Sequence, residues 1–252
     1  MTDANVTEFF GSWADRYDAA YDALDADGHA LRARLSAVLR LVGRGPGRIL
    51  DAGMGPGRLT WELDRAGWTV SGVDSTAEMV AIAQQRLPAA RDRLSVAEID
   101  ELPFPDDSFD AVVATGVLEY SGPERALQEL ARVLRPEGRA VVSYPNPSAV
   151  YGIWKTRVFY PLVRTAKRGL RRGSIRLPRG APIVGPAAFE RLLDGAGLSP
   201  EERVYTSYLP TISPLDAALP RLTARIGERL EHSGDRLGRL LATQVVFAAR
   251  KR

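Results

Sequence analysis

The sequence predicts an α/β fold in which helices cover both faces of a doubly wound, mostly parallel sheet. From Arg48 onward, short apolar runs alternate with stretches of helical periodicity, as they do in successive βαβ units. The first apolar run leads directly into a glycine-rich turn, DAGMGPG at 51–57, and such turns are typical of the loop between a strand and a helix.

Five apolar runs are expected to form strands. Each is short enough for a strand, and the run at 69–74 ends in an acid, Asp74. In parallel sheets of this kind, ligands bind beyond the carboxyl ends of the strands, so these ends mark the expected site. The runs lie at 48–50, 69–74, 94–99, 109–115 and 139–145.

The stretches between these runs carry helix signals. Gly67 is a suitable residue to end the first helix, and RPEG at 135–138 is expected to end the third. Ser75 and Glu78 have the S-x-x-E spacing of a capping box, which predicts that the second helix starts directly after Asp74. The expected helices lie at 59–66, after Asp74 and at 123–134.

Length and composition favour a single domain over residues 1–252. With 45% hydrophobic residues, a chain of this length can bury one large core. Three less regular regions are expected to form a partly helical cap over the carboxyl ends of the strands. The expected core comprises 43–146, 186–207 and 242–252, and the cap comprises 1–42, 147–185 and 208–241.

Several classes of protein are disfavoured by what the sequence lacks. There is no apolar run long enough to span a membrane, and the first residues do not form a basic and then apolar leader, so we expect a soluble, cytoplasmic protein. Without cysteine there is no disulfide or zinc–thiolate site. His29 and His232 are the two histidines and lie far apart in sequence, so no metal is expected.

The glycine turn suits neither of the two common phosphate-binding motifs. A P-loop needs Lys and Ser or Thr after its last glycine, whereas Arg58 and Leu59 follow Gly57. A dinucleotide turn that begins at Gly53 needs glycine where Arg58 stands. Asp51, just before the turn, would repel a pyrophosphate but could hold an ammonium group.

Asp74 supplies the second clue to the ligand. An acid at the end of the second strand can accept hydrogen bonds from the two hydroxyls of a ribose. A nucleoside that carries a cation and no pyrophosphate describes S-adenosylmethionine. An NAD(P)-dependent oxidoreductase is the alternative, disfavoured by Asp51 and Arg58.

Four motifs in order resemble the class I S-adenosylmethionine-dependent methyltransferases, in their small-molecule branch. They are DAGMGPG, the acid Asp74, LPFPDDSFDAVVATGVLEY at 102–120 and LARVLRPEGRAVVSYPN at 130–146. The resemblance extends from Phe9 to about Asn146, with a weaker match at 186–198. It implies a Rossmann-like sheet of seven strands and a transferase of small-molecule biosynthesis, with S-adenosylhomocysteine as a product.

The same resemblance implies which residues contact the cofactor. Gly53, Met54 and Gly55 would line its methionine part and Asp51 would orient the amino group, while Asp74 would take the ribose hydroxyls. Glu98 and Ile99 would contact adenine, Met79 would pack on adenine or ribose, and Tyr17 would reach the carboxylate. The implied set is Tyr17, Asp51, Gly53, Met54, Gly55, Asp74, Ser75, Met79, Glu98, Ile99, Thr115 and Gly116.

Some of these residues also have a purely structural interpretation. Asp74 could cap the following helix, and Glu98 could be a solvated acid of a loop. Tyr17 could be a packing aromatic, because other aromatic residues surround it in sequence, and Met79 could belong to the core.

Methyl transfer from a sulfonium is an in-line displacement, which requires mainly an aligned and desolvated nucleophile. Where the acceptor must lose a proton, the candidate bases are His29, Glu119 and Tyr120. Enzymes that methylate amino groups of nucleic-acid bases resemble one another in an Asn/Asp-Pro-Pro-aromatic motif. Residues 115–118 are TGVL instead, so we expect no nucleic-acid partner and an oxygen or carbon acceptor in a small organic metabolite.

A basic segment leaves the nature of the acceptor open. Residues 151–180 hold nine basic residues and no acid, whereas the whole chain has a net charge of +3. Its apolar residues recur every four positions, which predicts a basic amphipathic helix interrupted at Pro161. This helix could face solvent, bind an anionic acceptor or a carrier protein, or rest on a membrane that supplies a lipid, quinone or polyprenyl acceptor. A non-catalytic protein that binds S-adenosylmethionine is a further alternative.

Overall fold

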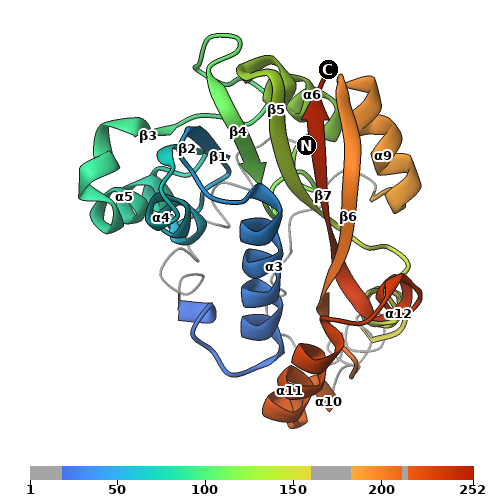
Figure 1. The fold of residues 1–252 in the computed structure, drawn as a ribbon. Coiled ribbons are helices and arrows are strands. Elements are labelled where there is room, and N and C mark those ends of the chain that lie inside the picture. The colour runs from blue at the N-terminus through green and yellow to red at the C-terminus, as the bar shows by residue number, and fades with distance from the viewer. Residues whose placement is uncertain (1–18, 160–182, 212–214) are drawn as a thin grey trace, which may run out of the picture.

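The computed structural model describes residues 19–159, 183–211 and 215–252 (Figure 1). These residues form one seven-stranded sheet in the order β3-β2-β1-β4-β5-β7-β6. The strands are β1 (Arg48–Ala52), β2 (Thr69–Asp74), β3 (Leu94–Val96), β4 (Phe109–Ala114), β5 (Leu134–Pro145), β6 (Leu198–Tyr208) and β7 (Ala242–Lys251). The expected seven-stranded, mostly parallel sheet is therefore confirmed.

The direction of the strands changes at one side of the sheet. The pairs from β3 to β5 are parallel, and β7 runs antiparallel to both β5 and β6. Asp51 pairs with Gly72, and Asp74 pairs with Val96. Both acids thus lie near the carboxyl ends of adjacent strands, which is the edge where the sequence places the ligand.

Helices cover both faces of this sheet (Figure 1). Apolar residues of α3 (Ala26–Val42), α4 (Arg58–Arg65) and α5 (Ala77–Arg86) pack on one face, where Val38, Leu63 and Ala83 are fully buried. On the other face, α6 (Pro123–Val133) and α9 (Pro186–Gly195) bury Leu127 and Phe189. The apolar spacing along α6 explains why its inner side joins the core.

Further helices gather beyond the carboxyl ends of the parallel strands. They are α7 (Val150–Trp154), α10 (Leu215–Ala218), α11 (Pro220–Leu230) and α12 (Asp235–Leu241), with a π-helical turn at 155–159. In Figure 1, α10, α11 and α12 lie at the lower end of the molecule. A 3₁₀ helix (Pro88–Arg93) precedes β3 at the other side.

Some sequence-based boundaries differ from the structure. The capping box is wrong: α5 starts at Ala77, Thr76 is its N-cap without a side-chain cap, and the Thr76 amide instead donates to Asp74 Oδ1. The third strand ends at Val96, before the expected 99, because the chain turns once the Ala97 amide has bonded to the Asp74 carbonyl. RPEG does not separate helix from strand, since β5 already begins at Leu134.

Candidate active site

The turn after β1 is built from three glycines in left-handed backbone conformations. Gly53, Gly55 and Gly57 have φ values of 79°, 54° and 78°. A Cβ at Gly53 would stand 2.9 Å from the Val117 Cβ, whereas a Cβ at Gly55 would meet nothing within 4 Å. Gly53 therefore allows close packing, while Gly55 leaves open space beside the backbone that a ligand can approach.

Asp74 ties this turn to the start of α5. Its Oδ2 accepts a hydrogen bond of 2.8 Å from the Gly55 amide, and its Oδ1 accepts one of 2.9 Å from the Thr76 amide. Burial raises the pKa of this carboxyl, although these amide hydrogen bonds work in the opposite direction. A carboxylate has lone pairs for further donors, so Asp74 can also accept the hydroxyls of a ribose.

Asp51 lies beneath the turn and is almost fully buried. The Thr60 hydroxyl donates to its Oδ2 over 2.7 Å. Its Oδ1 accepts no hydrogen bond from the residues that the structure describes. Burial raises the pKa of Asp51 to about 7, and repulsion from Asp74 adds to the rise, while Thr60 opposes it.

A first cavity follows the turn along the carboxyl ends of β1, β2 and β4. Its enclosed volume is about 90 Å³. Sites for small molecules usually enclose several hundred Å³, so side chains of this wall have to move aside for a nucleoside. The wall consists of Tyr21, Gly53, Met54, Gly55, Pro56, Arg58, Leu59, Asp74, Ser75, Thr76, Met79, Thr115, Gly116, Val117 and Tyr120.

A second, larger cavity of about 650 Å³ lies between α3, the ends of β5, β6 and β7, and α7. Apolar side chains dominate its wall, among them Leu31, Ile153 and Leu209. Arg34 connects the two cavities: it lines the second, and its Nη1 stands 3.0 Å from where a Cβ on Gly116, a residue of the first, would lie.

Comparisons with known proteins agree with this geometry. Residues 50–142 match the family model described as "Methyltransferase domain". The demethylmenaquinone methyltransferase of Thermus thermophilus is 37% identical over 202 residues, which cover 75% of this chain and 91% of that protein. The chain belongs to the class I S-adenosylmethionine-dependent methyltransferases.

One further relative agrees with this membership, and one solved structure agrees with the fold. The ubiquinone/menaquinone biosynthesis C-methyltransferase UbiE of Geotalea daltonii is 32% identical over 145 residues, which cover 54% of this chain and 61% of that protein. The crystal structure of an S-adenosylmethionine-dependent methyltransferase from Thermotoga maritima matches the fold with a TM-score of 0.62. It is 20% identical, over 97% of this chain and 99% of that one.

Family membership decides between the cofactors that the glycine turn left open. The methyltransferase uses S-adenosylmethionine, and the prediction made from Asp51, Arg58 and Asp74 is confirmed at the level of the cofactor. The alternative of an NAD(P)-dependent oxidoreductase is therefore excluded.

Most of the implied cofactor contacts share the wall of the first cavity. The structure brings together Asp74, which ends β2, and Thr115 and Gly116, which follow β4. Met79 is nearly buried and lies on the same wall, so packing in the core and contact with a ligand are compatible there. The implied contacts that line this one cavity are Gly53, Met54, Gly55, Asp74, Ser75, Met79, Thr115 and Gly116.

Three of the implied contacts within the described residues are not part of this wall. Asp51 accepts a hydrogen bond from Thr60 under the turn and does not line the cavity, and its contact with the amino group of the cofactor stays a prediction. Glu98 is exposed and Ile99 is buried in the core, both beyond the end of β3 and away from the cavity. Tyr17 lies outside the described residues.

Sequence reasoning did not assign Tyr21 and Arg58 to the site. Arg58 is the first residue of α4, its guanidinium lies 5.8 Å from the centre of the Tyr21 ring, and its Nη2 lies 3.6 Å from Asp22 Oδ1. Both side chains line the first cavity. The signal was present in the sequence, because an arginine at the first position of a helix after a glycine turn can meet an anionic group of the ligand.

The three candidate bases occupy three different places. Tyr120 lines the first cavity. Glu119 lies on neither of the first two cavity walls, and burial raises the pKa of its carboxyl. His29 lines a separate cavity near His232, with its Nε2 3.2 Å from Glu231 Oε1, so we propose no catalytic role for His29.

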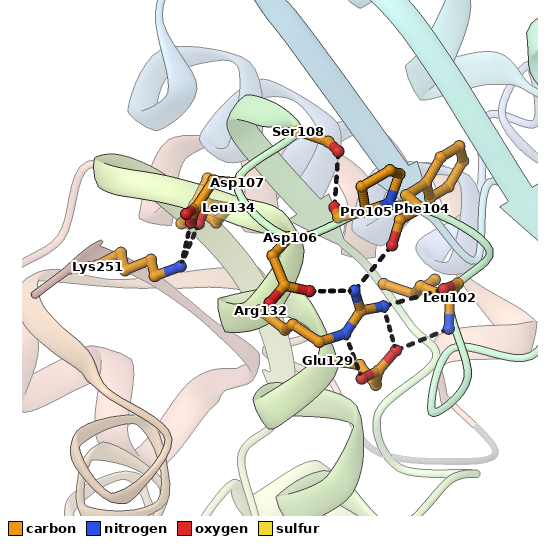
Figure 2. Close-up of polar contacts among 10 residues, drawn as sticks. All are labelled: Leu102, Phe104, Pro105, Asp106, Asp107, Ser108, Glu129, Arg132, Leu134 and Lys251. Atoms are coloured by element: carbon orange, nitrogen blue, oxygen red, sulfur yellow. Dashed lines mark hydrogen bonds and ion pairs between the residues drawn. The ribbon is translucent and has the colours of Figure 1, made fainter.

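Two of the family motifs meet at Arg132, as Figure 2 shows. Its guanidinium donates to Glu129 on α6, to Asp106 and to the carbonyls of Leu102 and Phe104, over 2.8 to 3.0 Å. The Leu102 amide in turn donates to Glu129. The LPFPDD stretch and the arginine of LARVLRPEG therefore belong to one hydrogen-bonded unit, which fixes the loop between β3 and β4.

Proposed function

We propose that the methyltransferase adds a methyl group to a ring carbon of a quinone-type acceptor in its reduced, quinol form. The observation that carries this proposal is the apolar cavity of about 650 Å³ beside the cofactor turn. Its size suits a fused aromatic ring and part of an apolar side chain. The names of two relatives, a demethylmenaquinone methyltransferase and a C-methyltransferase of quinone biosynthesis, favour the same acceptor class.

The residues of the first cavity fit S-adenosylmethionine, which supplies an electrophilic methyl group when it is bound. Open space beside Gly55 admits the methionine part, and Asp74 has acceptor capacity for ribose hydroxyls. Arg58 provides a positive charge for the carboxylate, and Tyr21 closes the same side of the wall. We retain Tyr17, Glu98 and Ile99 as proposed contacts that would complete the site after side chains move.

The reaction requires mainly that the acceptor is oriented toward the methyl group and shielded from water, and it depends less on acid–base catalysis. The quinol loses its hydroxyl proton to water, and the neighbouring ring carbon attacks the methyl carbon. The bound cofactor would supply the methyl group and would take the electron pair of the carbon–sulfur bond at sulfur. The ring carbon then loses its proton, and the oxygen regains one through water, so that one proton is released overall. The apolar wall, with Leu31, Ile153 and Leu209, holds the ring and excludes solvent during attack. Tyr120 lines the first cavity, where it can contact the reacting groups. Glu119 is proposed to act only indirectly, by orienting the guanidinium of Arg34.

Transfer of a labelled methyl group tests this proposal. The protein is incubated with methyl-labelled S-adenosylmethionine and demethylmenaquinol kept reduced by dithionite, and lipid and aqueous extracts are counted separately. We expect label in the lipid extract, bound to a ring carbon by NMR. Asp74→Ala should abolish most transfer, while Asp64→Ala, an exposed acid on α4, should not. If the wild-type protein labels neither demethylmenaquinol nor another quinol, the acceptor class is wrong.

We further propose that the cap contacts an anionic membrane, from which a quinone-type acceptor would enter. Exposed leucines on α10, α11 and α12 and at the N-cap of α11 support this contact, and α11 also exposes Arg221, Arg225 and Arg229. Most of the basic segment lies at 160–182, outside the described residues. None of the helices within the described ranges is long and apolar enough to cross a membrane. The leucines are Leu215, Leu219, Leu222, Leu237 and Leu240.

Co-sedimentation with vesicles tests the membrane contact. We expect binding to vesicles rich in phosphatidylglycerol at low salt and release at high salt, because salt screens the attraction. Leu222→Asp combined with Leu240→Asp should weaken binding. Val96→Asp, an equally exposed position on β3, serves as the control. Absence of binding at low salt would refute the contact and leave the methyl-transfer proposal standing.

A further inference from the structure

Arg34 is a buried cation at the junction of the two cavities. It lies on the inner side of α3 with 8% of its surface exposed. Its guanidinium faces Gly116 of the cofactor wall and also lines the apolar cavity. A charge in this position is costly to bury unless it interacts with charged or polar groups.

Glu119 is the carboxylate that faces Arg34 from the loop after β4. The Glu119 Oε2 atom is buried, and burial raises the pKa of this carboxyl, while the positive charge of Arg34 acts in the opposite direction. Its Oε2 accepts no hydrogen bond from the described residues. Glu119 can therefore help to orient the guanidinium through charge.

The rest of the apolar cavity offers few polar positions. Asp27 and Arg157 also lie on its wall, but both side chains are exposed. Gln244 at the start of β7 lines the cavity as well, and its buried Oε1 has no hydrogen-bond partner within the described ranges. Asn146, Ser207 and Thr243 also line the cavity, but their side chains already donate to backbone carbonyls. The buried cation of Arg34 and the amide oxygen of Gln244 are therefore the groups best placed for a ligand.

We propose that Arg34 binds the oxygen of an ionised hydroxyl group on the ring of the acceptor. This contact orients the adjacent ring carbon toward the cofactor. Gln244 accepts a hydrogen bond from a second hydroxyl of the ring. This assignment rests on the proposed function, and it specifies the acceptor as an aromatic compound with an ionisable hydroxyl next to the methylated carbon.

The physical reason is the strength of a charged pair in a dry cavity. A guanidinium binds a phenolate through short, charge-assisted hydrogen bonds, and the low dielectric of an apolar wall strengthens them. Negative charge on the oxygen also increases electron density on the neighbouring ring carbon. Arg34 thereby selects acceptors that can ionise and places the carbon that reacts.

Binding of two naphthoquinones separates this role from a structural one. The probes are 2-hydroxy-1,4-naphthoquinone, an anion at neutral pH, and 1,4-naphthoquinone, which is uncharged. Both are titrated by equilibrium dialysis in the presence of S-adenosylhomocysteine. We expect the wild-type protein to prefer the anion, and Arg34→Gln to weaken its binding about tenfold or more while changing that of the neutral probe less than about twofold. Arg34→Lys should restore part of the preference.

Two arginine variants serve as controls. Arg40→Gln removes a cation from the same helix at an exposed pair with Glu202 and should leave both probes unaffected. Arg157→Gln removes the exposed cation of the same cavity. Unchanged anion binding in Arg34→Gln, or a loss that appears only in Arg157→Gln, would overturn the assignment. If Arg34→Gln does not fold, binding of the two probes is measured in Arg34→Lys and Gln244→Leu instead. A wild-type preference for the anion in both of these variants would also overturn the assignment.

Methyl transfer to demethylmenaquinol distinguishes this assignment from the proposed function. If wild-type protein binds the anion through Arg34 but methylates no quinol, the acceptor class is wrong and the anion site stands. If methylation proceeds with an unchanged KM and kcat in Arg34→Gln, the acceptor class stands and the role of Arg34 is wrong.

Discussion

Asp74 determines whether the first cavity can hold a nucleoside. It anchors the turn through Gly55 and retains acceptor capacity for hydroxyl groups. We expect Asp74→Ala to weaken S-adenosylhomocysteine binding about ten- to a hundredfold, because hydrogen bonds to a charged group contribute about 1.5–3 kcal/mol each. Calorimetry measures the effect, with Asp64→Ala as the matched control. Wild-type affinity in Asp74→Ala would contradict the assignment.

Asp51 makes stability depend on pH. Its pKa of about 7 lies above the ordinary value of 3.8, so the folded chain keeps a proton that the unfolded chain has already lost. The free energy of unfolding should therefore fall as the pH rises between these two values, by up to about 4 kcal/mol for this group. Asp51→Asn should make urea unfolding less dependent on pH over that interval.

The free energy of unfolding of Asp51→Asn should still depend on pH to some extent. Burial also raises the pKa of Asp74 and Glu119, and both act in the same direction. Asp64→Asn, which removes an exposed acid, provides the reference. A slope in Asp51→Asn equal to that of the wild type would mean that Asp51 is ionised in the folded chain.

At the level of elements, the loop between β3 and β4 depends on one side chain. Arg132 joins α6 to two carbonyls and an acid of this loop (Figure 2). We expect Arg132→Met to reduce the free energy of unfolding by about 2–3 kcal/mol, since several hydrogen bonds are lost at a partly exposed site. Urea unfolding measures the loss, and Arg132→Lys should recover only a small part, because an ammonium cannot reproduce the planar fork.

A double variant identifies which partner matters. Arg132→Met combined with Glu129→Gln should cost less than the sum of the two single changes, because both remove the same ion pair. Additive losses would show that the carbonyl contacts, and not the pair with Glu129, hold the loop.

At the scale of the whole molecule, we propose that core and cap unfold together as one domain. The cap helix α12 is tied to the sheet, because the Asn146 amide donates to the carbonyls of Arg239 and Ala242. Urea should therefore produce a single cooperative transition. S-adenosylhomocysteine at a hundredfold excess over its Kd should add about 2.7 kcal/mol, and NADH should add nothing. Two separate transitions would show that the cap is an independent unit.

The sequence predicted the half of the molecule that local patterns define. The strands at 69–74 and 109–115, the turn at 51–57 and the acid Asp74 have local signals, and the structure assembles them as expected. It did not predict Arg34 or Gln244, because α3 and β7 are far apart in sequence and meet only through tertiary packing. The capping box failed because Asp74 takes the Thr76 amide.

In the sheet β7 lies between β5 and β6, although it is synthesised after both of them. On the ribosome, β6 emerges before β7, yet within the described sheet β6 is hydrogen-bonded to β7 alone. Until β7 arrives, β5 presents an unpaired edge and β6 has no strand to join. Unpaired edges are templates for aggregation, so this nascent chain is most vulnerable during the interval in which α10, α11 and α12 are translated.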